Sequence, residues 1–224
     1  MNVNTNITLK NNETYYAITT KTITITFNKN GASDIASSSK QCLLKNGDTS
    51  TGCVVRTPSI TPASGFTTVG WGTSASAIKG VSPNSDITVT ADKTYYAVTR
   101  KTLTATFATN GAASISSTSV GCLVYNGSTN GCAVLTPTIT AASGFTALGW
   151  ASAASAQAAT TIQTASVAQN ASTTIKNDTT FYAITQSSTE ITVTFKQNGT
   201  GTPDTTRKCR LYNTGNLPFL TKDK

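Results

Sequence analysis

The chain of 224 residues contains no histidine, and this absence excludes several kinds of active site. Without histidine there is no Ser-His-Asp or Cys-His nucleophile pair, no histidine ligand for zinc, and no imidazole that titrates near neutrality. Glutamate is almost as scarce: only Glu13 and Glu190 occur, so paired carboxylates for acid–base chemistry are in short supply. We therefore expect a protein that is not an enzyme and that uses no metal and no cofactor.

Long apolar runs and aromatic residues are also scarce. No stretch of about 18 apolar residues occurs, so we expect no membrane insertion by this segment. Aromatic residues make up 7% of the chain, whereas threonine alone accounts for 46 residues, with 23 serines and 17 asparagines. Threonine is β-branched and suits a half-exposed pleated surface, so the composition favours strands and polar loops.

The net charge of +8 is spread evenly along the chain. Residues 1–99 carry eight basic and five acidic groups, residues 100–185 carry three and one, and residues 186–224 carry six and three. The segments therefore carry +3, +2 and +3, and the densest basic spot, around Arg207 to Arg210, has no interleaved aromatic platform. This pattern favours a solvated surface, and no nucleic-acid partner is expected.

An internal repeat organises the sequence. Three strand-like motifs, each followed by Asn-Gly, begin the copies: Lys21-Thr-Ile-Thr-Ile-Thr-Phe27, Lys101-Thr-Leu-Thr-Ala-Thr-Phe107 and Thr189-Glu-Ile-Thr-Val-Thr-Phe195. Three further motifs end them: Thr14-Tyr-Tyr-Ala-Ile-Thr19, Thr94-Tyr-Tyr-Ala-Val-Thr99 and Thr180-Phe-Tyr-Ala-Ile-Thr185. We therefore expect complete repeats at 20–99 and 100–185, the last part of a repeat at 1–19, and the first part of another at 186–224.

Period-two alternation predicts the strands. In Thr22–Phe27 the apolar residues point one way and the threonines the other, and 87–98 indicates a hairpin with a polar turn at Asp92. The apolar parity changes between Tyr96 and Leu103, which requires a bulge or break, so a junction between domains is expected near 99–101. Such short junctions predict modules on a stiff string. The Ala/Ser-rich stretch 151–168 is expected to be a loop or one short helix.

Two cysteine pairs flank Asn-Gly turns, at Cys42 and Cys53 and again at Cys122 and Cys132. Asn-Gly favours a tight hairpin, which would place the two cysteines on neighbouring strands. Two cysteines without histidine are too few for a zinc site, so we interpret them as disulfides that support a small core, and disulfides indicate an oxidising compartment. Cys209 aligns with Cys42 and Cys122 but has no partner in sequence. It is expected to be an unpaired thiol, with intermolecular pairing as the alternative.

The order of strand, Asn-Gly, hairpin, Thr-Pro, Ser-Gly-Phe, Gly-Trp, hairpin and Tyr-Tyr-Ala resembles the Listeria–Bacteroides repeat, the B-repeat type found in internalin B and other bacterial surface proteins. Both complete copies match over almost their whole length, and the cysteine pair and the Ala/Ser-rich insert depart from the family pattern. The resemblance implies a mainly β, tandem array of small β-grasp-like (ubiquitin-like) mixed sheets. It also implies an extracellular location on the bacterial cell surface and a role in stalks and adhesion.

Four aromatic residues are candidates for contacts with a partner. Trp71 and Trp150 could stack on sugars or a host protein, or close the small core over a phenylalanine, and their recurrence at one repeat position favours the core. Tyr15 and Tyr95 alternate with Tyr16 and Tyr96, so one member of each pair should face solvent, and the exposed members are the better candidates.

These observations favour a non-catalytic stalk or adhesion segment of a bacterial cell-surface protein, in which disulfide-stapled repeats act as a spacer and offer surfaces to a host or neighbouring-cell protein or glycan. The alternative is a self-assembling filament or appendage subunit, joined head to tail by exchange of terminal strands.

Overall fold

A computed structural model describes residues 6, 8, 10–48, 50–152, 165–196 and 204–213. It divides into two compact units, Met1–Thr99 and Arg100–Lys224. Strands make up the regular structure, and no helix occurs in the described ranges. The predicted mainly β fold is therefore confirmed. Most of the insert between 151 and 168, for which a loop or short helix was expected, lies outside the described residues.

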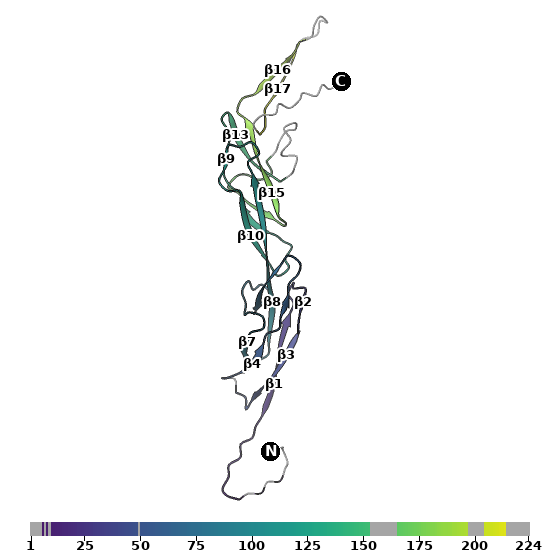
Figure 1. Ribbon diagram of the computed structural model, residues 1–224, viewed down its shortest axis with the longest axis vertical. Helices are drawn as coiled ribbons and strands as arrows, with labels where there is room; N and C mark the ends of the chain where they lie inside the picture. The colour runs from purple at the N-terminus through teal and green to yellow at the C-terminus, as the bar shows by residue number, and fades with distance from the viewer. Residues whose placement is uncertain are drawn as a thin grey trace. The chain divides into compact units, whose positions relative to one another are not determined.

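The first unit contains a mixed sheet and a second layer of short strands. In the sheet, β1 (Thr20–Asn28) pairs antiparallel with β3 (Ser39–Lys45) and parallel with the start of β8 (Lys93–Ala108) (Figure 1). β8 also pairs with β6 (Thr67–Gly72). Two further pairs join β4 (Cys53–Arg56) to β7 (Asp86–Val89), and β2 (Asp34–Ile35) to β5 (Ile60–Thr61).

The second unit repeats this arrangement. The later part of β8 pairs antiparallel with β10 (Ser119–Tyr125) and parallel with β15 (Thr179–Ser187), which pairs with β13 (Phe145–Ala151). The short pairs are β11 (Cys132–Leu135) with β14 (Ser172–Ile175), and β9 (Ser114–Ile115) with β12 (Ile139–Thr140). A further hairpin is made by β16 (Ile191–Phe195) and β17 (Thr205–Cys209).

Alternation in β1 places one face of the strand in the core, as predicted. Ile23, Ile25 and Phe27 are buried. Between them, Thr24 is half-buried and the other threonines are exposed. The buried residues join Leu44, Val55, Trp71 and Val89 in one cluster between the sheet and the short strands. Because both sides of this core come from strands of alternating pattern, a repeat of about 80 residues can bury a continuous apolar layer.

The alternation in β8 differs from the prediction. Tyr95 and Ala97 are buried, on the same parity as Leu103, and β8 is one continuous strand. The expected change of parity and break in the strand near 99–101 are therefore wrong, although the boundary between the two compact units lies between Thr99 and Arg100. The error arose because the adjacent residues Tyr95 and Tyr96 are both aromatic. Val98, on the other parity, is also buried. Hydrophobicity alone therefore did not identify which face of the strand points to the core.

The predicted hairpin at 87–98 is also wrong. β7 pairs with β4, whereas β8 pairs with β1, so the polar turn carries the chain from one sheet to the other. The turn is held by Asp92, whose side chain accepts a hydrogen bond of 2.7 Å from the backbone N–H of Thr24. Asp178 accepts the same bond from Thr104 at 2.8 Å in the second repeat.

A glycine before each tryptophan allows a close approach of the backbone. Gly70 has φ of 153°, and a Cβ there would lie 2.4 Å from the carbonyl oxygen of Val81. Gly149 has φ of 136° and would meet the carbonyl oxygen of Val167 at the same distance. The missing side chain lets each tryptophan form a β-bridge with that valine.

Candidate functional site

Both tryptophans lie inside the core. Trp71 and Trp150 are 0% exposed, and each indole N–H donates to a proline carbonyl, at 2.9 Å to Pro58 and at 3.0 Å to Pro137. The indoles meet Phe27 and Phe107 edge to face, at 4.8 and 4.9 Å between ring centroids. Since ring and N–H are both satisfied internally, these tryptophans cannot contact a partner of the folded repeats, and the core interpretation holds.

The two candidate tyrosines differ in exposure. Tyr95 is 5% exposed and stacks on Phe27 at 6.0 Å, so the expectation that it faces solvent is wrong. Tyr15 is 47% exposed and its hydroxyl donates to Glu13. This hydrogen bond raises the pKa of Tyr15 above its ordinary value. Tyr15 remains available for contacts.

The predicted disulfides are present, between Cys42 and Cys53 and between Cys122 and Cys132, with Cα–Cα distances of 6.4 and 5.9 Å. The turn within the first pair places Asn46 at φ of 53° and Gly47 at φ of 64°. The strands on either side, however, pair elsewhere, β3 with β1 and β4 with β7. Each disulfide therefore joins two sheets rather than two strands of one hairpin. Cys209, at the end of β17, is not in a disulfide and is half-buried.

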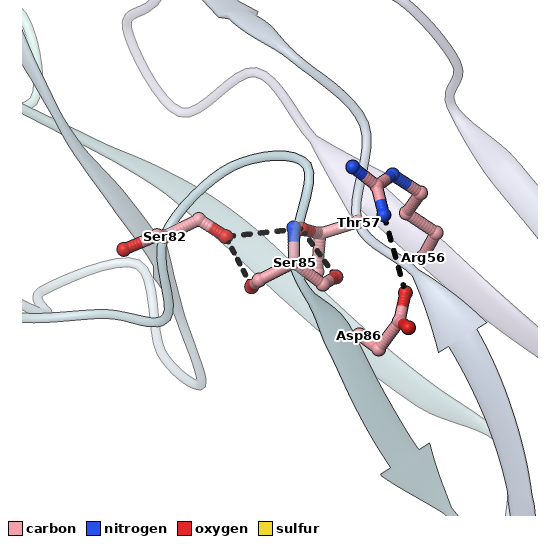
Figure 2. A network of polar contacts seen from close by, with 5 residues as sticks. All are labelled: Arg56, Thr57, Ser82, Ser85 and Asp86. Carbon is pink, nitrogen blue, oxygen red and sulfur yellow. Dashed lines mark hydrogen bonds and ion pairs between the residues drawn. The ribbon is translucent and has the colours of Figure 1, made fainter.

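A polar network lies at the ends of β4 and β7 in the first repeat (Figure 2). The hydroxyl of Thr57 lies 3.1 and 3.0 Å from the carbonyl oxygens of Ser82 and Ser85, and accepts the N–H of Ser85 at 3.1 Å. The backbone of Thr57 pairs with the same loop, donating to Ser85 and accepting from Asn84. We call Thr57, Ser82 and Ser85 the Thr57 network.

The second repeat shows what this network does. The hydroxyl of Thr136 lies 2.7 and 3.1 Å from the carbonyl oxygens of Ala168 and Ala171, and accepts the N–H of Ala171 at 3.0 Å. Alanine thus replaces both serines, and every contact of the threonine persists because the partners are backbone atoms. A cluster of three hydroxyl groups could suggest a reactive site. The comparison of the two repeats instead shows a buried threonine whose hydrogen bonds hold a loop in place.

The ion pair in Figure 2 lies at the protein surface. Arg56 and Asp86 face each other across β4 and β7 at 3.8 Å, with side chains 65% and 60% exposed. Leu135 and Ser172 occupy the paired positions in the second repeat. An exposed pair at this distance adds little to stability, and its absence from the second repeat shows that the fold does not need it.

Comparison with known proteins identifies the repeat. A family model described as the Listeria-Bacteroides repeat domain matches residues 24–98 and 104–184. The chain belongs to this family. No curated protein and no solved structure matches it. The family and the two disulfides together indicate an extracellular or surface repeat protein.

In this Listeria-Bacteroides repeat chain, the Asn-Gly motif has a role that sequence reasoning did not assign. The side chain of Asn30 donates to the carbonyl oxygen of Ala97 at 3.0 Å, and that of Asn110 donates to Ala183 at 2.9 Å. Both asparagines have φ of 43°, in the left-handed region that asparagine tolerates better than most residues. The recurrence of Asn-Gly in all three copies was the available signal.

Acidic groups in the described residues form no group of three His, Cys, Asp or Glu that could hold a metal ion. Asp48 binds the hydroxyls and backbone N–H groups of Ser50 and Thr51, which lowers its pKa strongly. Lys29, at 3.0 Å, lowers the pKa of Asp34. Both carboxylates stabilise local turns in the first repeat. No helix in the described part of the chain is long and apolar enough to cross a membrane.

Several apolar side chains of the two repeats stay exposed near the disulfides. Leu43 and Val54 follow Cys42 and Cys53, with 57% and 65% exposure. In the second repeat Leu123 and Leu135 are 41% and 59% exposed. Unlike the tryptophans, these side chains are apolar groups that a partner of the Listeria-Bacteroides repeats could reach, and Ile78, Val81 and Leu148 are exposed as well.

Proposed function

We propose that this chain is a non-catalytic stalk and adhesion segment of a bacterial cell-surface protein. Its repeats act as spacers, and their exposed faces contact a protein or glycan of a host or a neighbouring cell. The proposal combines the family membership with the chemistry of the two repeats.

One observation supports the spacer role most directly: the tryptophan and the threonine that fix the interior of one repeat recur, buried, in the other, whereas charged side chains at the surface of the first repeat are replaced in the second. The shared positions include Trp71 and Trp150, and Thr57 and Thr136, all at 1% exposure or less. Arg56 is exposed, and leucine replaces it in the second repeat. A spacer requires only that the fold be repeated.

Small-angle scattering of the 224-residue chain at low concentration tests this role. One compact body of this length would have a radius of gyration of about 17 Å. A string of modules should give a clearly larger radius and an extended distribution of interatomic distances. A radius of about 17 Å would contradict the spacer proposal.

The adhesion role can be tested separately with particles coated with the chain, applied to arrays of cell-surface glycans and proteins. The double substitution Leu43→Ser with Val54→Ser in the first repeat, and Leu123→Ser with Leu135→Ser in the second, should reduce retention because they remove exposed apolar area without touching the core. Undiminished retention by both variants would exclude these side chains as the contact surface.

A further inference from the structure

The hairpin of β16 and β17 reproduces the first two strands of a complete repeat. Ile191 lies opposite Cys209, as Ile23 lies opposite Cys42 in the pairing of β1 with β3. An asparagine that follows the hairpin, four residues after the cysteine, also matches. Asn213 exchanges two hydrogen bonds of 3.0 Å with the backbone of Thr185, and Asn46 exchanges equivalent bonds with Thr19. We therefore expect the free edge of β16 to accept a parallel strand, as the corresponding edge of β1 does.

The core face of β16 is only partly covered: Ile191 and Val193 are half-buried. Phe195 is 45% exposed, whereas its counterparts Phe27 and Phe107 are 2% and 3% exposed. Within the described residues β16 pairs only with β17. In each complete repeat the other edge of the first strand takes a parallel strand, which brings Tyr95 beside Phe27 and Phe181 beside Phe107.

A segment with the sequence of that parallel strand is exposed. Residues 14–18 have the same Tyr-Tyr-Ala motif as 94–98, yet no strand is assigned to them. Tyr15, Tyr16 and Ile18 are 47%, 84% and 74% exposed. Their counterparts Tyr95 and Val98 are 5% and 0% exposed. The chain thus has an unpaired edge on β16 and an exposed segment at residues 14–18. In each complete repeat the corresponding edge and segment pair with each other.

We propose that residues 12–18 of one copy of this chain pair in parallel with β16 of a second copy. The pairings Phe27 with Tyr95 and Phe107 with Phe181 set the register, so Tyr15 lies opposite Phe195. In this register Asn12 occupies the position of Asp92 and Asp178 and accepts the backbone N–H of Thr192. The backbone bonds supply affinity, and stacking of Tyr15 on Phe195 supplies the register.

The association is head to tail, because each copy donates one strand and accepts one. Such a contact does not close on itself unless the rotation between copies permits a ring, so chains of several copies form. It is also weak. Both tryptophans of the sequence lie in the complete repeats, and nothing in the two paired segments replaces the indole that covers Phe27. Self-association therefore depends on concentration and goes beyond the spacer role, which a single copy can perform.

Sedimentation velocity of the full chain tests the proposal, in a Cys209→Ser background that excludes intermolecular disulfides. The weight-average mass should rise over a hundred-fold range of concentration. Tyr15→Ser and Phe195→Ser should each remove the rise, and both residues are exposed, so the complete repeats should keep their melting temperatures. Tyr16→Ser is the matched control and should retain association, since its counterparts Tyr96 and Tyr182 remain half-exposed in the repeats.

Mixing the two single variants gives the sharpest readout. The Tyr15→Ser copy still accepts a strand and the Phe195→Ser copy still donates one, so the mixture should form pairs but no longer chains. A mass independent of concentration would overturn the proposal, as would association that survives both single variants or a mixture that stays monomeric. The spacer role would stand in each case, because scattering from dilute single copies measures it.

Discussion

In the first repeat the ring of Trp71 meets Phe27 at 4.8 Å and 67°, and in the second the ring of Trp150 meets Phe107 at 4.9 Å and 69°. The surfaces of the two repeats are not alike. Two ion pairs and one turn carboxylate in the first have threonine, leucine and serine at the matching places in the second. The comparison teaches that the interior defines this module, while its exterior is free to vary.

The tryptophans should give the largest and most equal effects. Trp71→Ala and Trp150→Ala each remove a fully buried indole and should destabilise their own repeat by about 3–5 kcal/mol. Calorimetry measures the shifted transition, and fluorescence of the remaining tryptophan reports on the untouched repeat. Markedly unequal losses would break the equivalence of the two interiors.

The disulfides should come next. Their loops have sequence separations of 11 and 10, so the chain-entropy contribution is nearly the same in both repeats. Replacing either pair by serine should lower the stability of that repeat by about 2–4 kcal/mol, measured by urea denaturation. An intact mass under non-reducing conditions should be about 4 Da below the reduced mass. An unchanged denaturation midpoint would show that the bridge adds no stability.

The Thr57 network allows a test of whether the serine side chains or only their backbone atoms contribute to stability. Thr57→Val leaves the N–H of Ser85 without its hydroxyl acceptor and should cost about 1–3 kcal/mol, with the same loss for Thr136→Val. Ser82→Ala with Ser85→Ala copies the second repeat and should change stability by less than about 0.5 kcal/mol. A larger loss in the serine variant would assign the network a role that the second repeat lacks.

Sequence reasoning identified the inner face of β1 and both disulfides, because alternation and cysteine spacing are local signals. It missed the burial of Tyr95, since two adjacent aromatic residues carry no sign of which one points inward. It also mistook the turn at Asp92 for a hairpin, because only the distant backbone of Thr24 decides that the chain changes sheet. The importance of Thr57 was hidden for a different reason, since threonine is common throughout the chain.

The smallest effect concerns pH. Hydrogen bonds lower the pKa values of Asp34 and Asp48 in the folded first repeat below the ordinary value of about 3.9. Their contribution to stability is therefore present above about pH 4 and is lost as the pH falls through the folded pKa values.

The second repeat has Ser114 and Ser128 at these positions. The melting temperature of the first repeat should thus fall slightly more than that of the second on acidification. Changing Asp34 and Asp48 to serine should remove the difference, and an identical acid response of both repeats in the unsubstituted chain would disprove the assignment.

The parallel pairing of β1 with β8 has a consequence for a protein held under tension. Its register joins Ile25 to Lys93 and Asn28 to Tyr96, so the first and last strands of the repeat lie side by side and run the same way. A pull at the two ends of the repeat slides these strands past one another and loads their hydrogen bonds together instead of peeling them apart in turn. Residues between Cys42 and Cys53 cannot be drawn out at all while the bridge is intact. The module is thus arranged to resist extension.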